Sequence, residues 1–344
     1  MTTVFVSHPA HRLDIYFGER ALGTLRSFAD VRLNPEPRDL STPELIAAAQ
    51  GCDALIAYRQ TCAPEALFAG LPQLAAFLRC AMDIRTVDVT AASHHGVLVT
   101  RASAGFNAAV AEWIIAVMLD LGRGVSRYAE AYHRGKPLPP VLGRELRGAT
   151  LGIIGFGGIG RTVCELALAF GMRVLVNTPQ AVETRDRVTP LSLHALLGDA
   201  DFVVCLAPAN EHTTHLIDAA ALSAMKPGAF FINASRGELV DERALLDALD
   251  SGRLGGCALD VGLAPDQMPS PELARHPRVI ATPHIGGLTQ PATEHQAIEC
   301  VDQLQTLLRG KTPPGAVNAE LATRWHSWAH TSPQTSPHSE PSLG

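Results

Sequence analysis

The fold of this chain is decided by the stretch Ala149-Thr150-Leu151-Gly152-Ile153-Ile154-Gly155-Phe156-Gly157-Gly158-Ile159-Gly160. Its apolar first half predicts a buried strand, and the residues after it have helical spacing. The glycines between them follow the order G-x-G-x-x-G: Gly155 permits a sharp turn, Gly157 a close approach of backbone to a pyrophosphate, and Gly160 tight packing of helix on sheet. An ordinary strand-to-helix turn can carry the same glycines. The strand before and the helix after favour a dinucleotide site.

The composition is that of a globular protein with room for two domains. The chain has 344 residues, of which 47% are hydrophobic and 18% charged, and this balance argues against a disordered chain. The formal net charge of −6 and the lack of basic runs argue against nucleic acid as a partner. No apolar run is long enough to span a membrane, so we expect no membrane partner.

Cysteine usage and the start of the chain predict a cytoplasmic protein. The seven cysteines are scattered and without C-x-x-C spacing, which is typical of reduced thiols and predicts no metal site. Val4-Phe5-Val6 enters a strand at once, without the basic and apolar segments of a signal peptide.

Strands and helices alternate along the chain, which predicts α/β units with parallel sheets covered on both faces. The expected strands of the first unit lie at 4–6, 54–58, 74–78 and 96–100. Those of the second lie at 150–154, 173–176, 201–206, 229–233, 256–261 and 278–283. Only the second unit contains phosphate-loop glycines, so the first has a different task. After about residue 319 the chain is polar and rich in proline and serine, and we expect a disordered tail over 320–344.

The segment from Asn107 to Leu121 predicts a long helix, with Asn107 as a possible cap. Its apolar surface is broad for a half-exposed helix. We expect burial between domains or against a second subunit, with core packing as the plainer alternative.

Polar side chains follow the last three expected strands of the second unit. Arg236 comes after strand 229–233, Asp260 ends strand 256–261 with Asp266 further along, and His284 follows strand 278–283. Ligands of open parallel sheets bind at the carboxyl ends of the strands. An arginine there can hold a carboxylate with two hydrogen bonds, a histidine can transfer a proton near neutrality, and an adjacent carboxylate can orient the imidazole. Plainer interpretations are also open: Arg236 could form an ion pair, His284 could be a surface histidine, and Asp260 could cap a turn.

The motifs from about Leu146 to Gly287 resemble the D-isomer-specific 2-hydroxyacid dehydrogenases, the family of phosphoglycerate, D-lactate and glyoxylate/hydroxypyruvate enzymes. The matching pieces stand in order at 155–160, 225–228, 232–241, 258–261 and 282–287, and the helix start at 107–112 is similar too. Residues 1–100 match the family in the order of strands and helices, but less closely in amino-acid sequence. The chain is therefore identified as a divergent member of the family.

The resemblance implies two doubly wound parallel-sheet domains. A Rossmann domain for NAD(P) occupies 103–288, and a flavodoxin-like, discontinuous substrate domain takes 1–102 plus 289–319. Family members are usually dimers, which implies a homodimer through 107–121. By the same resemblance, Arg236 holds the substrate carboxylate and carbonyl, and His284 is the general acid/base. The implied cofactor-binding residues are Gly155, Phe156, Gly157, Gly158, Ile159, Gly160, Asn177, Thr178, Leu206, Ala207, Pro208, Ala234, Ser235, Asp260 and Gly286.

Three departures from the family pattern concern the site. The position of the glutamate that partners the histidine is Pro265, and we expect the adjacent Asp266 to replace it as a catalytic residue. The glycine loop for the substrate carboxylate reads 79–85 Arg-Cys-Ala-Met-Asp-Ile-Arg, which makes Met82, Asp83, Arg85 and also Arg59 candidate substrate-binding residues. No acidic residue follows the second nucleotide-domain strand at Asn177-Thr178, so the choice between NAD and NADP stays open.

The favoured function is NAD(P)-dependent hydride transfer between nicotinamide and a small 2-keto or 2-hydroxy acid of D configuration. Two alternatives stay open. One is a low-turnover NAD(H)-sensing binding protein, which follows if Asp266 does not reach His284. The other is a related NAD(P) enzyme with a different substrate, motivated by Asp83.

Overall fold

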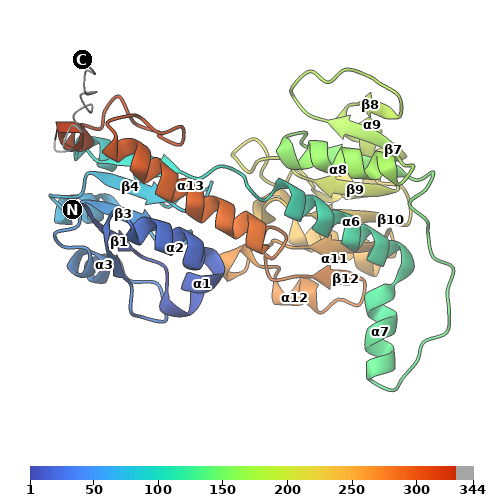
Figure 1. Ribbon diagram of the computed structural model, residues 1–344. Helices are drawn as coiled ribbons and strands as arrows, with labels where there is room; N and C mark the ends of the chain where they lie inside the picture. The colour runs from blue at the N-terminus through green and yellow to red at the C-terminus, as the bar shows by residue number, and fades with distance from the viewer. Residues whose placement is uncertain (331–344) are drawn as a thin grey trace, which may run out of the picture. The chain divides into compact units, whose positions relative to one another are not determined.

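The computed structural model describes residues 1–330 and divides them into two compact units. Unit 1 consists of Met1–Gly105 and the chain from Gln290 onward, and unit 2 is Phe106–Thr289. Figure 1 shows the element order by colour, with α13 (Gln290–Leu308) packed among elements from the start of the chain. The expected boundaries at 102/103 and 288/289 are close to these limits.

The sheet of unit 1 is parallel throughout and has the order β2-β1-β3-β4-β5, the arrangement of flavodoxin-like folds. The strands are β1 (Thr3–Val6), β2 (Asp30–Leu33), β3 (Ala54–Ala57), β4 (Ala76–Arg79) and β5 (Leu98–Arg101). The helices are α1 (Leu13–Tyr16), α2 (Gly18–Arg26), α3 (Thr42–Ala48), α4 (Glu65–Gly70), α5 (Val89–His94) and α13, with short 3-10 turns η1 (Ala10–Arg12) and η4 (Arg324–His330). The central strands β3 and β4 are buried along their whole length, because helices cover both faces.

The two faces of this sheet have separate cores. On one face α2 and α13 bury Leu25, Val301 and Leu304 against Val4 and Ile56. On the other face α3, α4 and α5 cover the alternate strand residues, among them Phe5, Leu55 and Phe77. Successive side chains of each strand point to opposite faces of the sheet, so each strand contributes residues to both cores.

The sheet of unit 2 is also parallel throughout, in the order β12-β11-β10-β9-β6-β7-β8. It is a Rossmann arrangement in which strand order reverses between β6 and β9. The strands are β6 (Thr150–Ile154), β7 (Arg173–Asn177), β8 (Val188–Pro190), β9 (Phe202–Cys205), β10 (Ala229–Asn233), β11 (Leu254–Leu259) and β12 (Val279–Ala281). The helices are α6 (Asn107–Arg123), α7 (Val125–His133), α8 (Gly158–Ala169), α9 (Leu193–Asp199), α10 (Ala219–Ala224), α11 (Glu242–Asp250) and α12 (Pro271–Ala274), with 3-10 turns η2 (Gly237–Leu239) and η3 (Pro265–Gln267).

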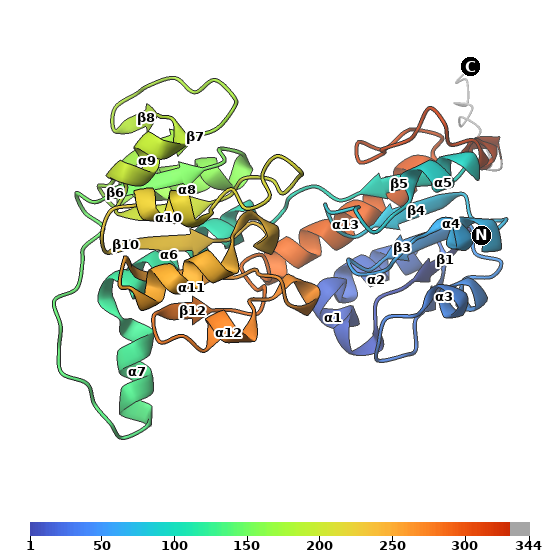
Figure 2. The ribbon, with the colours of Figure 1, turned by 180° about the vertical axis from the view of Figure 1, so that it is seen from behind.

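Helices cover this second sheet on both faces as well, which Figures 1 and 2 show from opposite sides. One core joins α6 and α8 to one face, and the other joins α9, α10, α11 and α12 to the opposite face. The chain is thus an α/β protein with two doubly wound parallel sheets, as expected from the alternation of strands and helices.

Helix α6 uses its apolar surface inside unit 2. Ala111, Ile114 and Met118 are fully buried in the core shared with α8, as the core-packing alternative expects. A subunit contact through 107–121 stays a prediction. Asn107 is the first residue of the helix and Phe106 occupies the cap position, which corrects the expected capping role. The exposed apolar residues of this region lie further on, at Leu119, Val125, Tyr132, Leu138, Val141 and Leu142.

The chain after α13 returns to the β5 edge, and the expectation of a disordered tail over 320–344 is wrong for its first part: the Thr323 amide donates to Gly96 O at 3.1 Å. The main chain at Gly315 and Val317 hydrogen-bonds to Arg101 and Val99 of β5, and Asn318 binds Val97 and Val99. Further on, Trp325 is 4% exposed in the core with α13. These residues close the β5 edge, which composition alone does not indicate. Residues 331–344 lie outside the described part of the chain.

The docked segment gives a stability prediction. Trp325→Ala removes a large buried ring, and we expect the free energy of unfolding to fall by about 3–5 kcal/mol. Thermal or denaturant unfolding of the two variants checks this, with Leu321→Ala as the control, because Leu321 is 63% exposed. A Trp325 variant as stable as the control contradicts the docking.

Candidate active site

The glycine turn after β6 has the geometry that a dinucleotide needs. Gly155 has φ +94°, and a Cβ atom on it would lie 2.6 Å from backbone atoms of Leu206 and Ala207. A Cβ on Gly160 would lie 2.6 Å from the Gly155 carbonyl oxygen, so this glycine lets α8 start against the turn. At Gly157, which precedes α8, no heavy atom lies within 4 Å of a Cβ position. The open space at a helix N-terminus fits a pyrophosphate.

Because of these contacts, alanine substitutions at Gly157 and Gly155 are expected to have different effects. Gly157→Ala is expected to fold like the wild type and to raise the dissociation constant for the dinucleotide at least about tenfold, or about 1.4 kcal/mol, because the methyl group occupies the phosphate approach. Gly155→Ala is expected to lower the melting temperature instead, because its methyl group meets backbone. Fluorescence titration and thermal unfolding measure the two effects. Unimpaired binding by Gly157→Ala would refute the pyrophosphate position.

Hydrogen bonds tie the other expected cofactor residues to the same edge of the sheet. The Leu206 amide donates to Ile154 O at 2.7 Å, and the Ser235 hydroxyl donates to Ala207 O at 2.6 Å. The loops after β6, β9 and β10 are thereby joined where Ala207-Pro208 and Ala234-Ser235 lie. At the end of β7, the Asn177 amide donates to Leu191 O at 2.9 Å, and Thr178 bonds to Gln180, so neutral groups occupy this strand tip.

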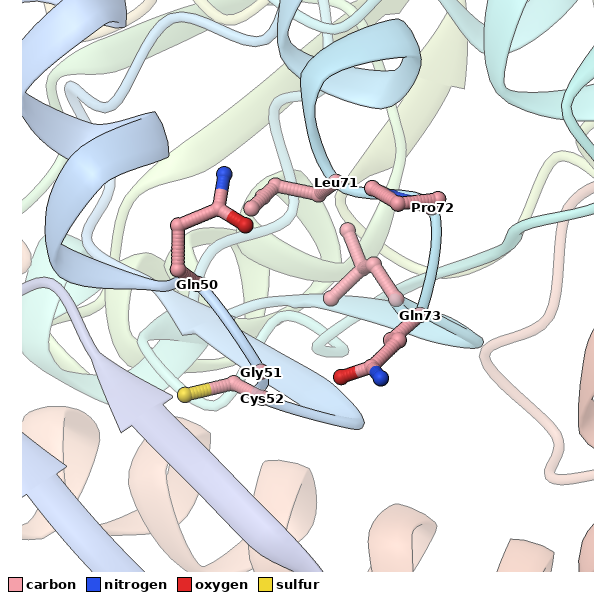
Figure 3. A pocket seen from close by; sticks show the side chains of 7 residues that line it. Gln50, Gly51, Cys52, Leu71, Pro72 and Gln73 are labelled. Carbon is pink, nitrogen blue, oxygen red and sulfur yellow. The ribbon is translucent and has the colours of Figure 1, made fainter.

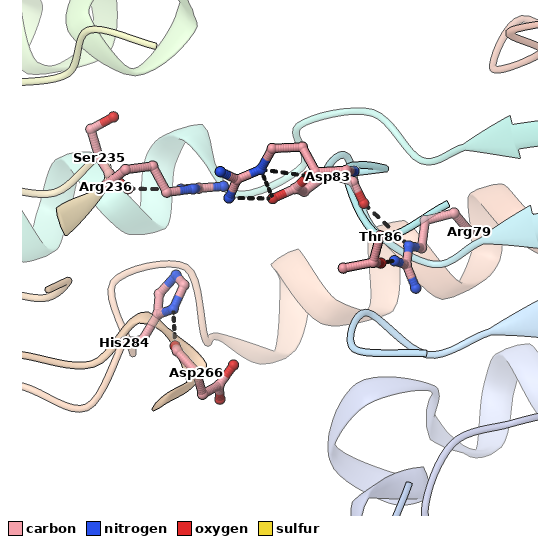
Figure 4. A network of polar contacts seen from close by, with 8 residues as sticks. Arg79, Asp83, Thr86, Ser235, Arg236, Asp266 and His284 are labelled. Atoms are coloured by element: carbon pink, nitrogen blue, oxygen red, sulfur yellow. Dashed lines mark hydrogen bonds and ion pairs between the residues drawn. The ribbon is translucent and has the colours of Figure 1, made fainter. Parts of the chain in front are cut away.

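Arg236 is presented by a loop that a buried asparagine shapes. Asn233 donates to Arg236 O at 2.9 Å and accepts from the Ser235 amide at 3.1 Å. The Arg236 guanidinium donates to Ser235 O at 2.7 Å (Figure 4). Gly237 follows immediately, and a Cβ there would lie 2.3 Å from the carbonyl carbon of Gly262. The loops after β10 and β11 therefore approach each other directly behind Arg236.

Asp260 fixes the loop that carries His284. It is 4% exposed, and its two carboxylate oxygens accept bonds from the Thr282 hydroxyl at 2.6 Å, the Ile285 amide at 2.8 Å and the Gly286 amide at 2.7 Å. This anchoring role was missed from the sequence, although Thr282 could have signalled it, since a hydroxyl at a strand end commonly bonds a neighbouring carboxylate. Contact of Asp260 or Gly286 with a cofactor stays a prediction.

His284 lies half-buried in the left-handed region, with φ +55°, where non-glycine residues are uncommon and often functional. Its Nδ1 lies 3.2 Å from the main-chain oxygen of Asp266. This contact is made by the main chain of Asp266, which has φ +58°, and in Figure 4 the Asp266 carboxylate points away from the imidazole. Nδ1 therefore donates to a neutral carbonyl, and proton transfer by the imidazole stays a prediction. The catalytic role expected for Asp266 stays a prediction.

The expected substrate residues of unit 1 follow β3 and β4. Arg59 lies with its guanidinium carbon 5.9 Å from the Tyr16 ring centroid, a partner that the sequence did not suggest. Asp83 and Arg85 form a forked ion pair at 3.0 to 3.2 Å, and the Arg85 amide also donates to Asp83 at 2.9 Å. Met82 is exposed. The loop is thus polar and internally paired where the family pattern has glycines.

A small hollow of about 320 Å³ lies at the other end of this sheet (Figure 3). Its lining residues precede β3 and β4 and include Gln50, Cys52, Leu71 and Gln73. Ligands of parallel sheets bind at the carboxyl ends of strands, so this hollow is separate from the candidate site. Within residues 1–330, no three metal-binding side chains gather, and no helix is both long and apolar enough to cross a membrane.

Comparison with known proteins agrees with this geometry. Residues 115–286 match the family model described as D-isomer specific 2-hydroxyacid dehydrogenase, NAD binding domain. The (S)-sulfolactate dehydrogenase of Chromohalobacter salexigens is 35% identical over 274 residues, which cover 77% of this chain and 87% of that protein. The chain belongs to this D-2-hydroxyacid dehydrogenase family.

The chain covers different fractions of the lengths of other family members. The glyoxylate reductase of Thermococcus gammatolerans is 32% identical over 88% of this chain and 94% of its own length. The chain spans about half of the phosphoglycerate dehydrogenase from Synechocystis, 51%, at 33% identity. Among solved structures, the TT0316 protein of Thermus thermophilus has a TM-score of 0.82 at 32% identity, covering 92% of this chain and all of that one.

Family membership establishes the general activity. The chain is an oxidoreductase that transfers a hydride between a nicotinamide dinucleotide and a small 2-keto or 2-hydroxy acid. Unit 2 contains the matched NAD binding domain.

Proposed function

We propose that this D-2-hydroxyacid dehydrogenase interconverts a small 2-keto acid and its D-hydroxy acid, with His284 as the general acid/base and Arg236 as the carboxylate-binding residue. The main support is the placement of His284. Its loop is held by three hydrogen bonds to Asp260, and its ring is oriented by Asp266 O, at the carboxyl end of the dinucleotide-binding sheet.

The protein's own groups then have defined tasks. Bound NAD(P)H supplies the hydride in the reducing direction. Arg236 holds the substrate carboxylate with its guanidinium fork and polarises the carbonyl. His284 keeps its Nδ1 proton on Asp266 O and gives the Nε2 proton to the carbonyl oxygen. In the oxidising direction Nε2 accepts the proton of the hydroxyl group.

We further propose that both NAD(H) and NADP(H) are accepted. An acidic side chain at the tip of the second strand binds the ribose hydroxyls and repels a 2′-phosphate. At that tip the chain has Asn177 and Thr178, both neutral, which supports weak discrimination between the cofactors. The Arg187 side chain, further along, bonds to Leu168 O and Asp186.

The proposal also covers the oligomeric state and the cellular location. We propose a homodimer, supported by exposed apolar residues on α7 and the loop after it, such as Tyr132, Val141 and Leu142; light scattering after size-exclusion chromatography tests it. A cytoplasmic location is supported by the seven cysteines, all of which are free thiols.

The deciding experiment is a cofactor and substrate survey of the purified protein. NADH and NADPH are titrated by fluorescence, and reduced nicotinamide is then followed by absorbance with glyoxylate, hydroxypyruvate, pyruvate and longer keto acids. Because one relative is a sulfolactate dehydrogenase, sulfolactate with each oxidised cofactor is included. Turnover with one of these acids supports the proposal. Tight cofactor binding without any turnover favours instead the NAD(H)-sensing alternative.

A further inference from the structure

Arg79 is a buried arginine at the end of β4, the strand that leads into the expected substrate loop. It is 1% exposed and is among the largest fully buried side chains of the protein. Burial of a cation is costly unless its donors are all used. A guanidinium in this position therefore calls for an explanation beyond the filling of space.

The guanidinium joins two loops of unit 1. Its Nη1 donates to Tyr58 O at 2.6 Å and to Thr61 O at 2.9 Å, in the turn after β3. Its Nε donates to Asp83 O at 3.2 Å, and its Nη2 donates to the Thr86 hydroxyl, both in the loop after β4 (Figure 4). A planar fork with donors in fixed directions suits this task better than a flexible ammonium.

The acceptors of Arg79 are neutral oxygens. The nearest carboxylate in sequence, Asp83, offers Arg79 its main-chain oxygen and pairs its side chain with Arg85. Burial lowers the pKa of Arg79 to about 10, so the side chain stays cationic at neutral pH. The cation thus serves to hold main-chain oxygens in place.

The segments between these contacts contain the residues that are expected from the sequence to bind the substrate. In the sequence, Arg59 lies between Tyr58 and Thr61, whose main-chain oxygens accept from Arg79. Met82, Asp83 and Arg85 all lie between Arg79 and Thr86. A further bond from the Ala63 amide to Thr86 O, at 2.9 Å, links the same two loops. Arg79 therefore helps to fix the spacing of all the expected substrate residues in unit 1.

We propose that Arg79 is a positioning residue for substrate recognition, acting through the loops that carry Arg59, Asp83 and Arg85 without touching the substrate. This inference rests on the proposed dehydrogenase function and on the substrate contact expected for those residues. It predicts a specific kinetic pattern, because loosened substrate loops weaken acid binding while the His284 machinery of unit 2 keeps its own hydrogen bonds.

The test compares Arg79→Lys with Arg101→Lys. Arg101 ends the neighbouring strand β5, but its side chain is exposed, so the same substitution there serves as the matched control. In Arg79→Lys the KM for the keto acid is expected to rise at least about tenfold, the effect of losing one charge-assisted hydrogen bond. We expect kcat and the dissociation constant for NADH to stay near wild type, and Arg101→Lys to change none of these quantities.

Hydrogen exchange gives a readout that does not depend on activity. The amides of Thr61, Ala63 and Arg85 bond within or between the two loops, and they should exchange faster in Arg79→Lys than in Arg101→Lys. Unchanged exchange overturns the inference, and so does faster exchange with an unchanged KM. If the wild type turns over none of the acids, the proposed function fails, and exchange still decides whether Arg79 holds the loops.

Discussion

Replacement of His284 by asparagine is expected to lower kcat for keto-acid reduction by about 10²- to 10⁴-fold, the usual contribution of a general acid. Asparagine tolerates the left-handed backbone that His284 adopts, and its amide can still donate to Asp266 O, so the loop keeps its shape. What is lost is the transferable proton on Nε2. Steady-state kinetics measures the loss, and fluorescence titration should give an unchanged dissociation constant for NADH.

His215→Asn is the matched control for this variant. His215 is also a histidine with positive φ, +51°, but it lies exposed in the segment after β9. Its replacement should leave kcat unchanged. If His284→Asn retains wild-type kcat, the acid/base assignment is wrong. If both variants lose activity to the same extent, the loss reflects backbone strain and not proton transfer.

Replacement of Arg236 by lysine should lower kcat/KM by about 10²-fold, which corresponds to losing a charge-assisted contact of about 3 kcal/mol. Lysine keeps the positive charge but has no planar fork, so it cannot hold a carboxylate through two parallel hydrogen bonds. It also loses the bond to Ser235 O that directs the guanidinium. Both KM and kcat are expected to change, because the fork binds the carboxylate and polarises the carbonyl.

The control is Arg243→Lys on α11, close by in sequence. Arg243 is exposed and pairs with Asp247 along the helix, so the substitution should leave kinetics and stability unchanged. Unchanged kcat/KM in Arg236→Lys would show that charge alone suffices and that the carboxylate is held elsewhere.

The sequence was sufficient to predict those elements whose residues are apolar throughout. β3, β6 and β9 are buried along their whole length and stand out as apolar runs. β2 went unrecognised because it is an edge strand in which exposed and half-buried residues alternate. The ordered segment over 320–325 was missed for a related reason, since its contacts are mostly main-chain bonds and a single tryptophan.

The candidate site residues that lie at the carboxyl ends of strands could be predicted from the sequence. Arg236, Asp260 and His284 lie at the carboxyl ends of β10, β11 and β12, as the rule for parallel sheets requires. The main-chain contact of Asp266 was not predictable, because it depends on two positive φ angles that no side-chain pattern reveals. Arg79 was read as part of a loop, and only its burial and its four acceptors indicate a task.

The return of the chain to unit 1 has a consequence for biosynthesis. Unit 2 is one unbroken stretch, whereas one face of the unit 1 sheet is covered by α13 and Trp325, which come after all of unit 2. On a ribosome the chain emerges from its amino terminus, and contiguous domains generally fold as units while it does so. This face of the β1–β5 sheet is therefore covered only in part, by α2, until α13 and Trp325 have been synthesised.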